Sequence, residues 1–176
     1  LDRKGREKIQ MEDMCQLSER LTEDKYKGSH EQVAKLLMKY SDSPLLDVSN
    51  FYEQVLFSFF TGNADMHLKN FSLLEKEGYG MSLSPAYDLV PTVLVNPKDP
   101  EELALTLNGK KRKLNYNDFL SAYENGGLNK KVLDNTLELF IYCLSELETL
   151  LEKSFTTDDL KEKYRKLLVK RYTQIG

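Results

Sequence analysis

The spacing of apolar residues along the chain predicts a mainly helical protein. Over 128–151 apolar residues return every three or four positions, and a similar pattern opens at Thr156 or Thr157 and reaches Tyr172. A further pattern over 47–60 carries aromatic residues along one predicted face. Shorter patterns predict helices over 11–22, 29–40 and 116–125.

Capping signals support several of these helices. Ser29 and Gln32 form a capping-box pattern at the start of the helix over 29–40. Asn115 is an N-cap candidate for the helix after it, and Gly62 suits the C-terminal end of the aromatic-rich helix. We therefore expect the aromatic-rich helix to be the central core helix and to hold the segment after Gly62 on a rigid support.

Two short apolar segments predict a β-hairpin in this helical chain. Residues 71–74 and 81–83 flank the turn-rich segment Glu-Lys-Glu-Gly-Tyr-Gly. Weak alternation over 103–107, followed by Asn108-Gly109, is compatible with one arm of a second hairpin, whereas 1–10 reads as a loop. The predicted fold class is thus mainly α (α+β), a helical bundle with one or two small β-hairpins.

The composition fits a single soluble domain. The 176 residues are 40% hydrophobic and 30% charged, with a net charge of −3, which offers no domain-wide footprint for nucleic acid. The basic run GKKRK at 109–113 is the one local candidate for such contacts, and we interpret it as a solvated loop. No apolar run is long enough to span a bilayer and no signal peptide is evident, so we expect a cytoplasmic protein with Cys15 and Cys143 reduced.

The residues with the most distinctive chemistry follow the predicted core helix. Asp65, His67, Lys69 and Asn70 share one loop, and Asp88 arrives after the hairpin. Protein kinases use a loop aspartate to accept the substrate hydroxyl proton, and an asparagine and a later aspartate to hold Mg²⁺. The order of residue types therefore indicates a phosphotransferase.

Each of these residues has a role in this interpretation. Asp65 is the predicted general base, and Asn70 and Asp88 carry the hard oxygen ligands that Mg²⁺ shares with the phosphates of ATP. The hairpin is expected to bring Asp88 back beside Asn70. His67 is expected to hydrogen-bond the transferring phosphate, and Lys69 either supplies positive charge there or is merely solvated.

Simpler interpretations stay open for the individual residues. Asn63 and Asp65 are also typical turn residues whose side chains cap local backbone. The pattern Asn-x-Asp-x-His suggests a metal site but lacks the glycine and closing glutamate of an EF-hand. His67 alone is as often structural, and Asp88 alone is compatible with a helix cap.

Four segments of the chain match a known family. GNADMHLKNFSLL at 62–74, followed by LSPAYDLVPT at 83–92, resembles the core of the HipA-like serine/threonine kinases, the toxin members of bacterial toxin–antitoxin operons. EDMCQL at 12–17 and KYKGSHEQVAKLL at 25–37 also resemble the family pattern. The resemblance extends over nearly the whole chain, and the opening Leu-Asp-Arg resembles the end of the family's hinge between lobes.

The resemblance implies an ATP-dependent protein kinase with a protein-kinase-like C-lobe. On the matched positions, Asp65 is the catalytic base, Asn70 and Asp88 are the Mg²⁺ ligands, and His67 is an active-site neighbour. Family substrates include aminoacyl-tRNA synthetases, whose phosphorylation stalls translation. The usual partner is a small helix-turn-helix antitoxin that binds the kinase and DNA, so nucleic acid is expected only indirectly through the antitoxin.

The resemblance also indicates which kinase parts fall outside residues 1–176. We find no glycine-rich loop, no strand lysine and no glutamate partner for it, which together hold the nucleotide in a kinase. We therefore expect residues 1–176 to be a C-terminal lobe alone, either a fragment of a longer kinase or half of a split one. Two other classes remain: a small-molecule phosphotransferase of the aminoglycoside or choline kinase type, and a non-catalytic antitoxin-binding module.

Overall fold

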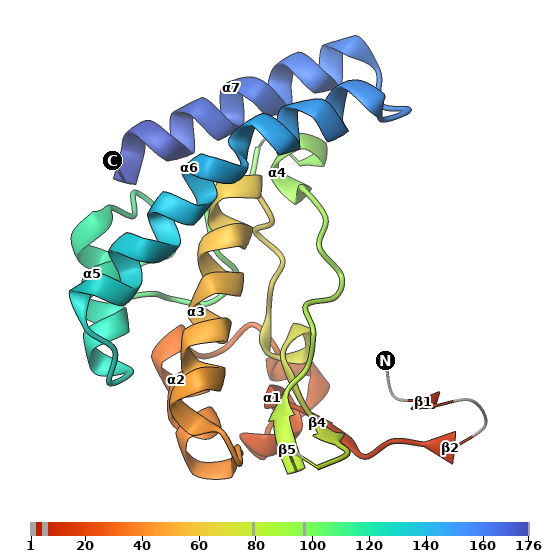
Figure 1. The fold of residues 1–176 in the computed structure, drawn as a ribbon, viewed down its shortest axis with the longest axis vertical. Helices are drawn as coiled ribbons and strands as arrows, with labels where there is room; N and C mark the ends of the chain where they lie inside the picture. Colours follow the sequence, from red (N-terminus) through yellow and green to blue (C-terminus); the bar gives the residue numbers. More distant parts are fainter. Residues whose placement is uncertain (1–2, 5–6, 79, 97, 176) are drawn as a thin grey trace.

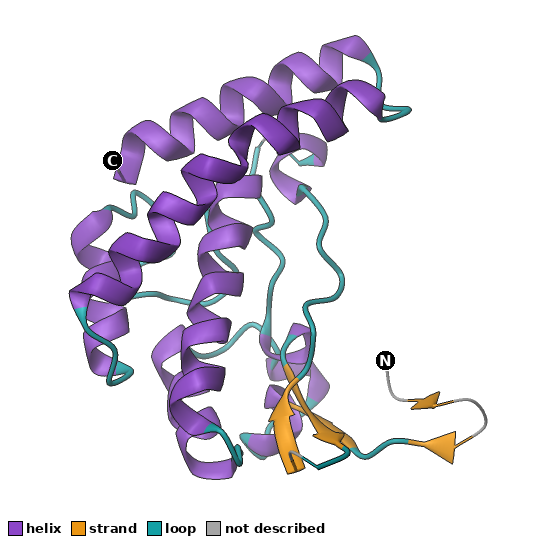
Figure 2. Cartoon of the chain, in the orientation of Figure 1, coloured by secondary structure: helices purple, strands orange, loops and turns teal. Residues whose placement is uncertain are grey.

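The computed structural model describes residues 3–4, 7–78, 80–96 and 98–175. Helices dominate them, and the strands lie at one end of the molecule (Figure 2). This arrangement confirms the predicted mainly α (α+β) class. The α-helices are α1 Met14–Leu17, α2 His30–Tyr40, α3 Pro44–Thr61, α4 Thr92–Val95, α5 Tyr116–Asn125, α6 Lys130–Lys153 and α7 Asp158–Ile175, with 3₁₀ turns at Thr22–Asp24 and Leu68–Asn70.

The main sheet has three antiparallel strands in the order β3-β4-β5. The predicted hairpin is present, with Leu74 opposite Ser82. The strand that adds to this hairpin, β3, pairs with β4 and places Glu12 opposite Leu73. The strands are β3 Met11–Asp13, β4 Ser72–Lys76 and β5 Gly80–Leu83, and a separate pair is formed by β1 Arg3–Lys4 and β2 Glu7–Lys8.

The helix predicted over 11–22 is confirmed only over 14–17. Residues 11–13 form an edge strand, and the helix that follows lasts only one turn. Asp13 ends the strand and caps the helix, because its side chain accepts a hydrogen bond from the Gln16 backbone in a capping box. The apolar pattern marked burial of Met14 and Cys15 correctly, but it did not reveal the pairing with β4.

Two paired strands do not form around 103–107 in the described residues, but the turn expected at Asn108-Gly109 is present. Leu107 and Lys110 instead form a single bridge around a tight turn, with Asn108 and Gly109 both at positive φ (48° and 74°). A short strand pair occurs at the N-terminus, where the sequence was read as a loop. The basic run after this turn is mostly exposed, and Lys110 forms an ion pair with Asp118 at 2.8 Å.

Helix α3 is the central helix of the fold, as predicted (Figure 1). It begins at Pro44, which stands in the first turn, where a missing N–H costs nothing. The apolar spacing predicted a start near residue 47. Its buried face carries Val48, Phe51, Tyr52, Val55, Leu56 and Phe59, all with no exposed surface.

The C-terminal helices α6 and α7 run antiparallel across the end of α3 (Figure 1). Helix α7 is tied to the body by Arg171, which pairs with Glu102 and lies over the Phe59 ring at 4.7 Å. The N-caps predicted for α2 and α5 are both present, at Ser29 and Asn115. Cys15 and Cys143 are free, and no helix in the described part of the chain is long and apolar enough to cross a membrane.

The buried histidine His30 should make stability depend on pH. It has no exposed surface, neither ring nitrogen finds a partner among the described residues, and burial lowers its pKa to about 3. The folded state therefore excludes the proton that the unfolded chain binds below about pH 6.5, so stability falls as pH drops below that value.

Denaturant unfolding tests this dependence. We expect the free energy of unfolding to fall by about 1 kcal/mol between about pH 7.5 and about pH 5.5. In His30→Leu most of this pH dependence should disappear. His67, the other histidine, also has a lowered pKa, so a smaller dependence remains in the variant. An unchanged pH dependence in His30→Leu would contradict this assignment.

Candidate active site

The loop of residues 63–70 starts where α3 ends. Gly62 takes the left-handed conformation (φ 74°), and a Cβ at this position would lie 2.4 Å from a Val93 methyl carbon. The first residue of α4 also holds the loop, because the Ala64 backbone N–H donates to Thr92 Oγ1 at 2.9 Å. The loop therefore lies between the end of the core helix and the chain that follows Asp88.

Asn63 connects the two halves of the site. Its side chain is buried, its Nδ2 donates to the Asp88 backbone carbonyl at 3.2 Å, and its Oδ1 accepts from the Asp65 backbone N–H at 3.2 Å. From the sequence, Asn63 was considered as a turn residue or as part of an Asn-x-Asp-x-His metal pattern. The contact with Asp65 has that character, whereas the contact with Asp88 crosses 25 residues of sequence.

Asn70 and Asp88 are in direct contact. Asn70 Nδ2 donates to Asp88 Oδ2 at 2.7 Å. The β4–β5 hairpin returns the chain to this point, and Asp88 adopts a left-handed backbone conformation (φ 56°), which is uncommon among non-glycine residues but less so for aspartate, asparagine and histidine. Because such conformations often occur at functional sites, this observation adds weight to Asp88.

The donor chemistry of Asn70 and Asp88 fits a magnesium site that also uses phosphate oxygens. One carboxylate and one amide oxygen are the protein share that Mg²⁺ commonly takes. Asp88 Oδ1 has no hydrogen-bond partner within the described ranges, whereas Asn70 Oδ1 accepts from the His67 backbone N–H at 3.3 Å. Those ranges also contain no cluster of three or more His, Cys, Asp or Glu side chains suited to a metal ion.

Asp65 has one engaged and one open carboxylate oxygen. Tyr26 donates its phenol hydrogen to Asp65 Oδ1 at 2.8 Å, and no described residue hydrogen-bonds Oδ2. The side chain is half-buried and borders a cavity of about 180 Å³. That cavity is lined by Ala64, Asp65, Thr92, Val93, Asn96 and Asp99.

His67 lies beside Asp65 and is largely buried. Its ring meets the Tyr26 ring edge-on at 5.0 Å between centroids. Burial lowers the pKa of His67, and the positive charge of Lys25 acts in the same direction, against the carboxylates of Asp65 and Asp88. The imidazole is therefore neutral near pH 7, and its Nδ1 is buried without a hydrogen-bond partner in the described part of the chain.

Lys69 is paired with a residue that the sequence analysis did not single out. Its ammonium lies 3.0 Å from Asp13 Oδ2, and its backbone carbonyl accepts from the Tyr87 hydroxyl at 2.7 Å. Lys69, Asp13 and Tyr87 border a cavity of about 260 Å³. No pattern links Asp13 to Lys69, because 56 residues separate them. The contribution of Lys69 to cofactor binding stays a prediction, as do the roles of the other site residues.

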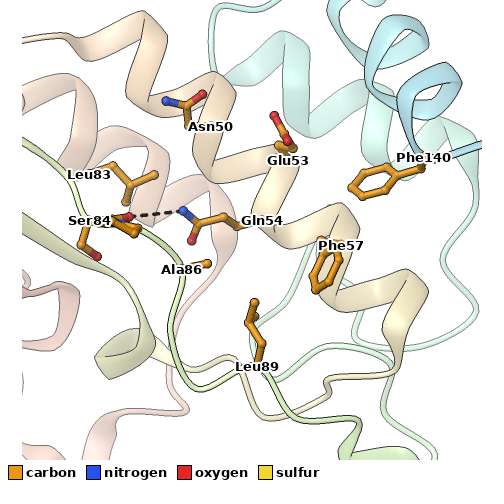
Figure 3. Close-up of a pocket in the computed structure, with 10 residues that line it drawn as sticks. Asn50, Glu53, Gln54, Phe57, Leu83, Ser84, Ala86, Leu89 and Phe140 are labelled. Atoms are coloured by element: carbon orange, nitrogen blue, oxygen red, sulfur yellow. Dashed lines mark hydrogen bonds between the residues drawn. The ribbon is translucent and has the colours of Figure 1, made fainter. Parts of the chain in front are cut away.

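An apolar cavity borders the segment that leads to Asp88. It has a volume of about 390 Å³. On its wall, Gln54 Nε2 donates a hydrogen bond to the Ser84 carbonyl at 3.4 Å (Figure 3). No local pattern predicts this cavity, because its walls come from separate elements. They are Asn50, Glu53, Gln54 and Phe57 of α3, residues 83–86, Leu89, and Phe140 of α6.

Comparison with known families identifies the domain. A family model described as the HipA-like C-terminal domain matches residues 1–146. The chain belongs to this family. This match confirms the resemblance seen in the sequence. The candidate site therefore lies in a domain of a kinase-like family.

Individual relatives carry kinase names. The chain is 29% identical over 137 residues to "Putative kinase Y4dM" of Sinorhizobium fredii, covering 77% of this chain and 33% of that protein. It is 28% identical over 160 residues to a "Putative kinase" of Haemophilus influenzae, covering 80% and 47%. The HipA-like chain thus spans about half or less of the length of these relatives.

A solved structure shares the fold. A chain of the Shewanella oneidensis MR-1 complex of the toxin–antitoxin proteins HipA and HipB with operator DNA superposes with a TM-score of 0.82. The alignment covers 99% of the present chain and 47% of that chain, at 21% identity. At this identity the match establishes the fold.

Asn63 should stabilise the site loop. Asn63→Ala removes both of its hydrogen bonds and leaves the Asp65 N–H and the Asp88 carbonyl without their partner. We expect a loss of about 1–2 kcal/mol in the free energy of unfolding. Amide exchange at Asp65 should also accelerate, measured by hydrogen–deuterium exchange on this chain.

Asn135→Ala is the matched control, because Asn135 lies exposed on α6 away from the loop. It should change neither quantity. Unaltered exchange at Asp65 in Asn63→Ala would show that Asn63 does not hold the loop.

Proposed function

We propose that residues 1–176 form the C-terminal catalytic lobe of an ATP- and Mg²⁺-dependent HipA-like serine/threonine protein kinase. The observation that carries the proposal is the direct contact between Asn70 and Asp88 beside an aspartate with one open oxygen. Family membership and the names of the relatives support a kinase.

Asp65 acts on the substrate hydroxyl in this proposal. The hydroxyl oxygen attacks the γ-phosphorus, the bond from that phosphorus to ADP breaks, and Asp65 Oδ2 receives the hydroxyl proton. Asp88 Oδ1 would provide one oxygen for Mg²⁺, and Asn70 Oδ1 would provide another after rotation of the amide that now donates to Asp88. The ion would neutralise phosphate charge. Neutral His67 is the nearby group suited to hydrogen-bond the transferring phosphate, and Lys69 is the additional candidate for a contact with ATP.

The proposed substrate and partner follow from the family. The substrate is a protein of the translation machinery, such as an aminoacyl-tRNA synthetase, and the partner is a helix-turn-helix antitoxin. The occurrence of HipB and operator DNA with the similarly folded Shewanella structure supports this partner class. DNA is then contacted only indirectly, through the antitoxin, and the protein acts as the toxin of the pair.

Phosphate transfer by the full-length kinase tests the role of Asp65. With radiolabelled ATP, Asp65→Asn should lower the rate constant for transfer to protein by at least about a hundredfold, the usual share of a general base. Asp88→Asn should abolish transfer, because it removes the carboxylate proposed as a metal ligand.

Asp159→Asn, an exposed change on α7, is the control and should leave the rate unaltered. Equal transfer by the native protein and Asp65→Asn would overturn the site assignment. Transfer to aminoglycosides or choline in preference to protein would favour the small-molecule phosphotransferase, and binding of an antitoxin without any transfer would favour the non-catalytic module.

Isothermal titration with Mg-ATP tests the assignment of residues 1–176 to one lobe. Kinases bind the nucleotide largely with a glycine-rich loop and a strand lysine. We find neither of them in this sequence. We therefore expect a dissociation constant for the isolated chain weaker than about 1 mM, which corresponds to less than about 4 kcal/mol of binding free energy. Micromolar affinity would contradict the one-lobe assignment.

A further inference from the structure

We propose that Tyr26 is a positioning residue that fixes Asp65 so that one carboxylate oxygen faces the substrate hydroxyl. This inference rests on the proposed function, because it assigns Tyr26 a task only if Asp65 is the general base. Tyr26 was not among the residues selected from the sequence.

The segment that carries Tyr26 is attached to the site loop at several points. Its phenol donates to Asp65 Oδ1 at 2.8 Å, and its ring meets the His67 ring edge-on. The neighbouring backbone is also bound, because the Leu68 N–H donates to the Lys25 carbonyl at 3.1 Å. The phenol is therefore held in place by contacts additional to the hydrogen bond with Asp65.

These contacts leave Asp65 with an asymmetric carboxylate. Oδ1 accepts from Tyr26, the backbone N–H is bound to Asn63, and Oδ2 has no hydrogen-bond partner in the described part of the chain. A general base needs one oxygen free for the incoming proton and a fixed orientation for the other. A single hydrogen bond to Oδ1 supplies this orientation without occupying Oδ2.

The phenol suits this task because it is neutral and keeps its proton. Tyr26 is 44% exposed, and its partial burial together with the hydrogen bond and charge of Asp65 raises its pKa to about 12. A lysine or arginine in its place would form an ion pair with the base. Tyrosine orients the carboxylate and adds no positive charge to it.

Steady-state kinetics of the full-length kinase test the proposal. Tyr26→Phe keeps the ring against His67 and removes only the hydroxyl, so we expect kcat to fall by about tenfold. KM for ATP should stay within about twofold, because the change alters orientation of the base and not nucleotide binding. In an Asp65→Asn background the same change should cause no further loss.

Tyr142→Phe is the matched control, because Tyr142 is 76% exposed on α6, and it should leave kcat unchanged. An unchanged kcat in Tyr26→Phe would overturn the inference. A raised kcat would also overturn it, because the phenol would then obstruct the base. If Asp65→Asn retains full activity, the proposed function fails first, whatever Tyr26 does.

A second measurement uses the isolated chain and needs no activity. In ¹³C-tyrosine NMR, with the Tyr26 signal assigned by its loss in Tyr26→Phe, the phenol should titrate near the raised value. Asp65→Asn should lower the pKa of Tyr26 towards its ordinary value of about 10, because the neighbouring negative charge is removed. A Tyr26 pKa that does not respond to Asp65→Asn would show that the contact does not form.

Discussion

The burial of α3 is the constraint on which the candidate active site depends. Phe51, Tyr52 and Phe59 have no exposed surface, and each large apolar side chain contributes about 1.5–3 kcal/mol when fully buried. Phe51 packs against Phe71 at 4.9 Å, so the helix before the site loop and the residue after it share one aromatic core. The loop of residues 63–70 is consequently fixed at both ends by the same packing.

Much of this arrangement is readable from local sequence. The capping box of α2, the aromatic face of α3, the αL glycine after it and the β4–β5 hairpin all follow from patterns within a few residues. The hairpin in turn made the approach of Asp88 to Asn70 an expectation from topology. These features were accessible because each depends on backbone geometry over one or two turns.

Features that depend on distant segments were not accessible in this way. Residues 11–13 have a helical apolar spacing, yet they pair with β4 some 60 residues later, and such pairing depends on tertiary arrangement. The Tyr26–Asp65 hydrogen bond joins residues 39 positions apart. Periodicity reports which side chains are buried, and it contains no information about which hydroxyl meets which carboxylate.

The long-range contacts of the two site aspartates share one property, which is that their partners are neutral. In the described part of the chain neither Asp65 nor Asp88 forms an ion pair; their partners are the neutral phenol of Tyr26 and the neutral amide of Asn70. Lys69, one residue from Asn70, pairs instead with Asp13.

A lysine paired with either carboxylate would offset its negative charge and lower its basicity, which would weaken both proton acceptance and metal binding. Neutral partners orient the two aspartates and leave their negative charge available. This is the electrostatic condition that phosphoryl transfer requires of a base and a magnesium ligand, and it arises here from contacts between segments far apart in the chain.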